Sequence, residues 1–224
     1  MNIYSILVHP NKVSLNASLF AYANEYFTAQ GHTVKTLDLY DRSKELIESS
    51  VVMTTTTSTD VEKYQRSDIL YNFSTAGKRD LHTDYIKEQL ANLRAADVLY
   101  IQTPIWVWSI PAMLKLYIEN TFMPNEMFLQ SNPASETEYK ITPLMEGKKV
   151  VFSFTLGGSE TMAAYITGGR TQLLTPIKNI FGFVGYEWVE PHLLWGVSER
   201  DTLENKQEKY FAKFKEYLES LNLK

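Results

Sequence analysis

Short apolar runs alternate with longer amphipathic segments along the whole chain. Five runs have the length and the branched apolar residues of buried strands: Ile3–Val8, Thr33–Leu39, Val98–Gln102, Lys149–Thr155 and a run within Glu187–Leu193. Between and after them, apolar residues recur every three or four positions, which predicts helices after Ser14 and over Asp84–Ala95, Ala112–Phe122, Thr171–Val184 and Asp201–Leu221. Strands that alternate with helices predict an α/β domain with a parallel, doubly wound sheet.

Two longer stretches interrupt this alternation, one near residues 40–82 and the other near 123–147. The first contains the threonine run Thr54–Thr57 and few apolar stripes, so we expect mostly irregular structure there. The second contains Asn132-Pro133 and is expected to be a surface excursion. Neither is long enough for a second domain, so the sequence predicts one domain over 1–224 with two insertions.

The composition narrows the possible chemistry. Apolar residues make up 44% of the chain and aromatic residues 13%, which allows a sizeable core and a stacking site. The absence of cysteine excludes thiol chemistry and cysteine-ligated metals, and four histidines without an HExxH pattern argue against any metal site, so redox chemistry would need an organic cofactor. A net charge of −4 gives no reason to expect nucleic acid. The N-terminus resembles a first strand, and no run suits a membrane helix, which predicts a cytoplasmic protein without stable membrane insertion.

Ligands of open α/β sheets bind outside the carboxyl ends of the strands, and two loops at such positions are informative. The first, His9–Asn16, is polar and opens a helix, where free N–H groups and the helix dipole favour phosphate. The alternative is an ordinary capped helix start, because neither GxGxxG nor GxxxxGK[ST] is present.

The second loop, Thr103–Pro111, is aromatic and flanked by Pro104 and Pro111. Trp106 and Trp108 alternate around Val107, which in a buried strand would be core packing. The prolines argue against a continued central strand, so a binding surface for a planar ring is an equal alternative.

Paired glycines form the third loop, Thr155–Thr161, where Gly157 and Gly158 would let backbone N–H groups approach a ligand. The alternative is a flexible strand-to-helix turn. Gly168-Gly169-Arg170 is better explained as a plain turn than as a phosphate site, and His82 and His192 are interpreted as structural or surface residues.

These motifs, in this order, resemble the NAD(P)H:quinone oxidoreductases of flavodoxin-like fold. The likeness rests on His9 with Ser14-Leu15-Asn16, on Gln102–Lys115, on Thr155-Leu156-Gly157-Gly158 and on Glu190-Pro191, and it extends from about Ile3 to Leu221. The resemblance implies a flavodoxin-like, five-stranded parallel sheet with strand order 2-1-3-4-5.

The resemblance also implies a flavin site. His9, Ser14, Leu15 and Asn16 would hold the phosphates and the ribityl chain; Pro104, Ile105, Trp106, Val107 and Trp108 would line the isoalloxazine; and Thr155, Leu156, Gly157 and Gly158 would complete the pyrimidine edge. The N–H groups of Gly157 and Gly158 would stabilise negative charge on the reduced ring. Trp108 and Tyr165 would border the substrate, with Tyr165 as candidate proton donor. Two departures stand out: the family's partner histidine is replaced within Gly168–Arg170, and Val107 replaces a common aromatic residue.

The implied activity is two-electron reduction of a quinone-like acceptor by NAD(P)H through a flavin, with ping-pong kinetics and a homodimer. FAD is favoured over FMN because the chain resembles the longer family members. The alternatives are a flavodoxin-type electron carrier, a flavin-binding regulatory subunit without its own substrate, and an azo- or nitroreductase with nearly the same site.

Overall fold

The sheet of this protein has the predicted strand order. The computed structural model describes residues 1–54, 82–131, 140–197 and 207–223. Parallel strands follow one another across the sheet in the order β2 (Thr33–Asp38), β1 (Asn2–Leu7), β3 (Val98–Pro104) and β6 (Lys149–Thr155). The fifth position is shared by β7 (Glu187–Trp188) and β8 (His192–Leu194), which both pair with β6. This arrangement confirms the order 2-1-3-4-5.

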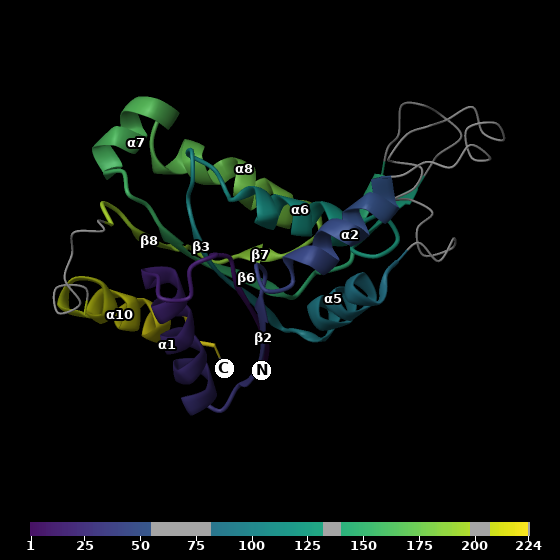
Figure 1. Cartoon of the computed structure of the whole chain (residues 1–224), viewed down its shortest axis with the longest axis horizontal. Helices are drawn as coiled ribbons and strands as arrows, with labels where there is room; N and C mark the ends of the chain where they lie inside the picture. The colour runs from purple at the N-terminus through teal and green to yellow at the C-terminus, as the bar shows by residue number, and fades with distance from the viewer. Residues whose placement is uncertain (55–81, 132–139, 198–206, 224) are drawn as a thin grey trace.

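Helices cover both faces of the sheet (Figure 1). One face carries α1 (Leu15–Ala29) and α10 (Ala212–Ser220), which follows a π-helical turn at Gln207–Phe211. The other face carries α2 (Ser43–Thr54), α5 (Asp84–Ala95), α6 (Ala112–Thr121) and α8 (Arg170–Phe183). The short α7 (Glu160–Thr167) follows the carboxyl end of β6 and leads into α8.

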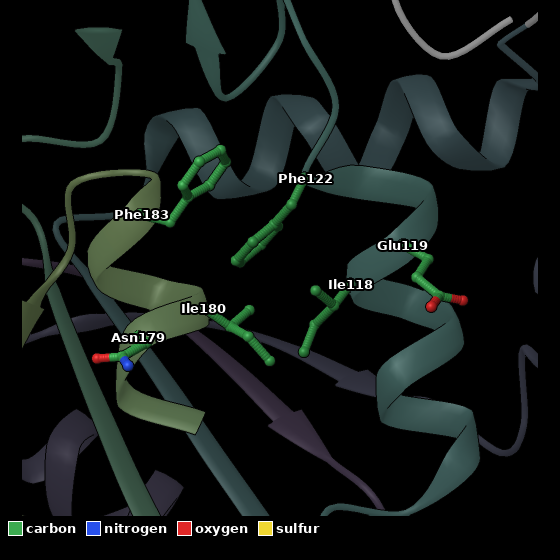
Figure 2. A pocket seen from close by; sticks show the side chains of 6 residues that line it. All are labelled: Ile118, Glu119, Phe122, Asn179, Ile180 and Phe183. Carbon is green, nitrogen blue, oxygen red and sulfur yellow. The ribbon is translucent and has the colours of Figure 1, made fainter. Parts of the chain in front are cut away.

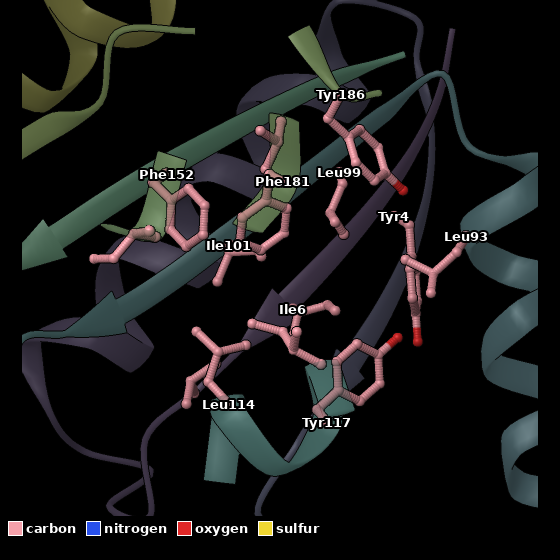
Figure 3. Packing of buried hydrophobic residues seen from close by; sticks show 14 of the residues in the cluster. Tyr4, Ile6, Leu93, Leu99, Ile101, Leu114, Tyr117, Phe152, Phe181 and Tyr186 are labelled. Carbon is pink, nitrogen blue, oxygen red and sulfur yellow. The ribbon is translucent and has the colours of Figure 1, made fainter. Parts of the chain in front are cut away.

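Side chains alternate between the two faces of each strand, and this alternation divides the core in two. Tyr4, Leu99 and Phe152 pack under α5, α6 and α8, as Figure 3 shows for part of this cluster. Ile3 precedes Tyr4 and Tyr100 follows Leu99 along their strands, so both side chains point to the opposite face and pack under α1 and α10. Because both faces are covered, the central strands are apolar along their length, which is why they could be predicted.

The expectation of irregular structure near 40–82 is wrong for its first part. Helix α2 occupies Ser43–Thr54, with Leu46 fully buried. The Ser49 hydroxyl lies 2.6 Å from that of Thr83 and ties α2 to the start of α5. Over 43–51 the buried side chains are those of Leu46 and the polar Ser49, which gives no apolar stripe, and the adjacent threonines obscured the helix. Residues 55–81 lie outside the described residues.

The stretch 123–147 is not simply a surface excursion. Strands β4 (Phe128–Ser131) and β5 (Lys140–Pro143) pair antiparallel within it. The side chains of Met123, Met127 and Met145 are buried in the main core. The turn signal at Asn132-Pro133 concealed these anchors, and residues 132–139 lie outside the described part of the chain.

Element boundaries agree with the predictions at several places and differ at others. Helix α5 and strand β6 have the predicted bounds. The last strand is interrupted between β7 and β8, where Pro191 has no N–H for the ladder. Strand β3 continues to Pro104, and α8 begins at Arg170, one residue before the predicted start, with Pro176 inside it. The predicted helix Asp201–Leu221 is described only from Gln207 onward.

Candidate active site

The three loops singled out in the sequence meet at one edge of the sheet. Strands β1, β3 and β6 are parallel, so their carboxyl ends lie together. The His9 and Trp106 rings contact each other edge to face, with centroids 5.8 Å apart. The backbone N–H of Ile105 donates to the Thr155 carbonyl at 2.9 Å. The first and third loops therefore flank the second.

The first loop is a capped helix start that keeps donors free. The Ser14 hydroxyl accepts from the Ala17 N–H at 3.2 Å. The N–H groups of Leu15 and Asn16 have no acceptor among the described residues. Free N–H groups in the first turn of a 15-residue helix favour an anion.

The charges beside this loop are already paired. Lys12 forms ion pairs with Asp38, at the end of β2, and with Asp41. Burial lowers the pKa of His9, which favours the neutral ring, and its Nδ1 accepts from the Asn11 N–H at 3.1 Å. An anion at α1 would therefore be bound mainly by neutral donors and by the helix dipole.

The second loop is a tight and strained turn. The N–H and C=O groups of Trp106 and Ser109 pair reciprocally at 2.9 and 3.0 Å. Val107 and Trp108 between them have φ values of 49° and 60°, the left-handed region that both central residues of a type I′ turn require. A β-branched valine is strained there, and its side chain is 95% exposed. Such strain persists where the surrounding structure holds the residue, and it is typical of functional sites.

The third loop is shaped by the close approach of a ring to a glycine. A Cβ added at Gly158 would lie 2.8 Å from the Trp108 ring, whereas one at Gly157 would meet only the Val197 carbonyl, at 3.7 Å. Neither glycine N–H donates to a described residue. Glycine at 158 thus lets the indole close on the loop, while the loop keeps its donors available.

A chain of buried hydrogen bonds lies directly beneath these loops. The Tyr100 hydroxyl donates to the Gln102 side-chain oxygen at 2.7 Å, and the Gln102 amide donates to the Asn16 side-chain oxygen at 2.9 Å. The Asn16 amide then donates to the Thr155 hydroxyl at 2.8 Å. Sequence reasoning placed Asn16 and Thr155 in the site and gave Gln102 no role. The signal for Gln102 was present: it is a polar residue at the end of an apolar strand.

The remaining predicted residues lie on or near α7. Tyr165 is 91% exposed, and its hydroxyl has no partner among the described residues. Gly168 and Gly169 have φ values of 85° and 107° and form the turn between α7 and α8. Arg170 forms an ion pair with Glu190. These features support the interpretation of Gly168–Arg170 as a plain turn.

His82 and His192, interpreted from sequence as structural or surface residues, are both 9% exposed. The ring of His192 stacks on Tyr217, and burial lowers its pKa to about 4. A neutral, stacked histidine fits a structural role.

The chemistry of this edge fits a flavin. Flavins present phosphate at one end, a flat apolar ring in the middle, and carbonyl and nitrogen acceptors along the pyrimidine side. The edge supplies free N–H groups at the start of α1, indole rings at Trp106 and Trp108, and free N–H groups at Gly157 and Gly158. The donor set and the flat walls correspond to those three parts.

Comparison with known proteins agrees with this geometry. The sequence model of the flavodoxin-like fold matches residues 1–218. The NAD(P)H dehydrogenase [quinone] 1 of Cavia porcellus is 30% identical over 198 residues, which are 86% of this chain and 67% of that protein. The FMN-dependent NADH:quinone oxidoreductase of Hydrogenovibrio crunogenus is 32% identical over 108 residues, which are 48% of this chain and 47% of that protein. A candidate quinone reductase from Klebsiella pneumoniae has the same fold, with a TM-score of 0.79 at 21% identity over 100% of this chain and 85% of that one.

The chain is thus a protein of the flavodoxin-like fold. Within that fold it belongs to the NAD(P)H:quinone oxidoreductase family, as the resemblance in its sequence motifs implied, and its enzyme class is NAD(P)H dehydrogenase (quinone).

Proposed function

We propose that this enzyme binds a flavin at the carboxyl edge of the sheet and reduces a quinone or a similar acceptor with electrons from NAD(P)H. The bound flavin would supply the chemistry, taking a hydride at N5 from NAD(P)H and passing it to the acceptor. The observation that carries the proposal is the convergence of the three loops, which places indole rings between two sets of free N–H groups.

The residues of this chain would bind and orient the flavin and polarise its ring. The start of α1, with His9, Ser14, Leu15 and Asn16, would hold the phosphate end. Residues 104–108 would wall the ring, and residues 155–158 would face its pyrimidine edge. The N–H groups of Gly157 and Gly158 would lie where negative charge develops on reduction, as donors of an oxyanion hole do.

A shared place for NAD(P)H and acceptor, beside Trp108 and Tyr165, predicts ping-pong kinetics. Initial rates measured against one substrate at fixed levels of the other should give parallel double-reciprocal plots. Intersecting plots would show that both bind at once. If the loaded protein shows no NAD(P)H oxidation with any quinone, the electron-carrier alternative replaces the enzyme.

The cofactor is expected to be FAD, as for the longer family members, although the Hydrogenovibrio relative is FMN-dependent by name. The visible spectrum of the purified protein tests whether a flavin is bound, and mass identification of the released flavin tests whether it is FAD. A colourless protein that gains no flavin absorbance with FAD or FMN overturns the proposal. Release of FMN alone corrects only the cofactor.

A homodimer is the expected assembly, and the exposed apolar side chains indicate where its interface would form. In the apolar segment 122–129, Met123, Met127 and Phe128 are buried, and Leu129 is 45% exposed. Apolar side chains are also exposed on the second loop and on α7: Trp106, Val107, Met162, Tyr165 and Ile166. These two segments adjoin at Gly158, since a Cβ there would approach both the Trp108 ring and the Met162 sulfur.

A second apolar surface lies between α6 and α8. It is a groove of about 400 Å³ in which Ile118 and Phe122 face Ile180 and Phe183 (Figure 2). Light scattering of the flavin-bound protein at micromolar concentration tests the dimer, and a monomer mass contradicts it. Val107→Glu against Ile180→Glu then identifies which surface is used. None of the described helices is long and apolar enough to cross a membrane. A cytoplasmic location stays the expectation drawn from the sequence.

A further inference from the structure

The buried hydrogen-bond chain beneath the loops runs in one direction in the structure, from Tyr100 through Gln102 and Asn16 to Thr155. Its side chains lie on the α1 face, because Tyr100 and Gln102 alternate with Ile101 along β3 and Thr155 lies opposite Pro104 in register. Gln102, Asn16 and Thr155 are 0%, 5% and 4% exposed, so bulk solvent does not compete for their hydrogen bonds. A buried network of this kind fixes geometry when every member is satisfied.

The direction follows from donors and acceptors. Burial holds the pKa of Tyr100 well above its ordinary value, so the phenol keeps a hydrogen that it can donate, and in the structure its hydroxyl donates to the Gln102 oxygen. The Gln102 amide must then face Asn16 as a donor, which turns the Asn16 oxygen toward it. The remaining Asn16 donor reaches the Thr155 oxygen.

Thr155 is therefore an acceptor inside the protein, and its own hydrogen is committed to no acceptor among the described residues. Thr155 is the last residue of β6, immediately before Leu156-Gly157-Gly158, and its carbonyl holds Ile105 of the second loop. A threonine hydroxyl that accepts from within and lies at this edge can donate outward, into the candidate site.

We propose that Gln102, held by Tyr100, is a positioning residue that sets the Asn16 amide so that the Thr155 hydroxyl donates to a polar atom of the bound flavin. This inference rests on the proposed flavin site. Gln102 touches no reacting atom; it acts through two intermediates. Its role is to remove the alternative rotamer of Asn16, in which the amide oxygen would face Thr155 and draw the hydroxyl hydrogen inward.

A double-mutant cycle on flavin affinity tests this coupling. Thr155→Val removes the donor and should weaken flavin binding about 10-fold, the usual cost of one well-made hydrogen bond, while Thr155→Ser should retain it. Gln102→Met should weaken binding to a similar extent in the wild-type background and add little in Thr155→Val. Dissociation constants come from quenching of flavin fluorescence on titration with apoprotein. Additive losses would show that Gln102 does not act through Thr155 and would overturn the proposal.

Gln102→Glu gives a readout that a merely structural role would not produce. A protonated glutamic acid accepts from Tyr100 and donates to Asn16, as glutamine does. An ionised one can only accept, so Asn16 must turn its amide group toward it, and the oxygen of Asn16 then faces Thr155. Flavin affinity of this variant should fall as pH rises, whereas that of the wild type should not.

The titratable groups around the chain do not interfere with this measurement. Burial raises the pKa values of Tyr100 and its neighbour Tyr217, so both keep their hydrogens. His192, which reaches Ser153 at 3.3 Å, has its pKa lowered to about 4 by burial, so none of the three changes charge between about pH 6 and pH 9. In Gln102→Glu/Thr155→Val the pH dependence should disappear. If it persists, the carboxylate acts by its charge and not through Thr155, and the proposal fails.

Gln89→Met is the matched control. Gln89 is equally buried and also accepts from a tyrosine, Tyr4, but it lies in the α5 cluster on the other face. Its loss should leave flavin affinity unchanged. If wild-type protein binds no flavin, the proposed function fails; if it binds flavin and the Gln102 variants bind it equally well, only the positioning role fails.

Discussion

Two tyrosine–glutamine pairs are buried on opposite faces of the same sheet. At the carboxyl edge, Tyr100 donates to Gln102, and the amide of Gln102 continues to Asn16. Under α5, Tyr4 donates to Gln89, and there the side-chain N–H₂ of Gln89 finds no acceptor among the described residues. Burial raises the pKa of Tyr4 to about 12, so this phenol is also a neutral donor. Figure 3 shows its surroundings, where the hydroxyls of Tyr4 and Tyr117 approach each other.

The difference shows what each pair can specify. In the chain at the carboxyl edge each side chain is hydrogen-bonded to the next, so each amide has one orientation and the hydroxyl of Thr155 is left to donate outward. The pair under α5 ends at an amide group that has no acceptor among the described residues, which costs free energy and passes no orientation on to the carboxyl edge. We therefore expect changes at the first pair to affect ligand binding, and changes at the second to affect stability alone.

The largest effect should come from lowering the pH, which protonates His192 next to the hydrogen-bond chain at the carboxyl edge. The pKa of His192 is about 4 in the folded protein and about 6.5 when unfolded, so the unfolded state binds the extra proton first as pH falls. The contribution of His192 to stability should be constant above about pH 6.5 and decrease toward pH 4 by up to about 3 kcal/mol. Urea unfolding between these pH values measures the decrease. His192→Gln should remove this part of the slope and Gln89→Met should keep it; an unchanged slope in His192→Gln would refute the assignment.

Next in size is the substitution of one of two adjacent glycines. Gly158→Ala places a methyl group 2.8 Å from the Trp108 ring, and the strained turn can yield only by moving that indole. Overpacking of this kind costs about 1–3 kcal/mol, or roughly 10- to 100-fold in flavin affinity if it is the binding geometry that yields. Gly157→Ala, whose Cβ would meet only a carbonyl at 3.7 Å, is the control and should bind flavin nearly as the wild type does. Equal affinities would mean that Trp108 is not held by this contact.

Substitutions within the two tyrosine–glutamine pairs should have smaller effects, and these should differ between the pairs. Tyr4→Phe or Gln89→Met alone leaves a buried partner unsatisfied and should cost about 1–2 kcal/mol of unfolding free energy, while the double variant should recover most of that loss. Neither should alter flavin affinity. Tyr100→Phe should lower both stability and flavin affinity. If Tyr4→Phe weakens flavin binding as much as Tyr100→Phe does, the distinction between the two faces is lost.

The fold was largely predictable because burial on both faces leaves a strong pattern. Strand β6 and helix α5 have the predicted bounds, since their apolar residues follow a single period. Helix α2 was not predicted, because over 43–51 it buries Leu46 and the polar Ser49, whose hydroxyl contacts that of Thr83 at the start of α5. The anchors Met123 and Met127 were missed because a methionine in a turn-rich stretch has no periodicity to reveal burial.

The site was predictable loop by loop, but its connections were not. Each loop stands at a strand end, and strand ends of a parallel sheet share one edge. Sequence could not show that Asn16 and Thr155, which are 139 positions apart, are hydrogen-bonded. It also could not show that the Trp108 ring contacts Gly158. That contact depends on the left-handed backbone of Val107 and Trp108, which is unusual for residues other than glycine. Local sequence carries local geometry, whereas these contacts arise only after the strands are paired.

The smallest effect is expected at Tyr165, which is exposed and belongs to neither buried pair. Its side chain is 91% exposed and its hydroxyl has no partner among the described residues, so Tyr165→Phe should leave stability and flavin affinity unchanged. Turnover should fall only a few-fold, because water can reach the same place and no histidine follows to assist the proton. Positioned proton transfer typically contributes about 10²–10⁴-fold. A loss of that size in kcat, with flavin affinity intact, would identify Tyr165 as the principal acid. Tyr165→Ala separates the ring from the hydroxyl: if it raises KM for the acceptor while Tyr165→Phe does not, the ring borders the substrate and the hydroxyl is dispensable.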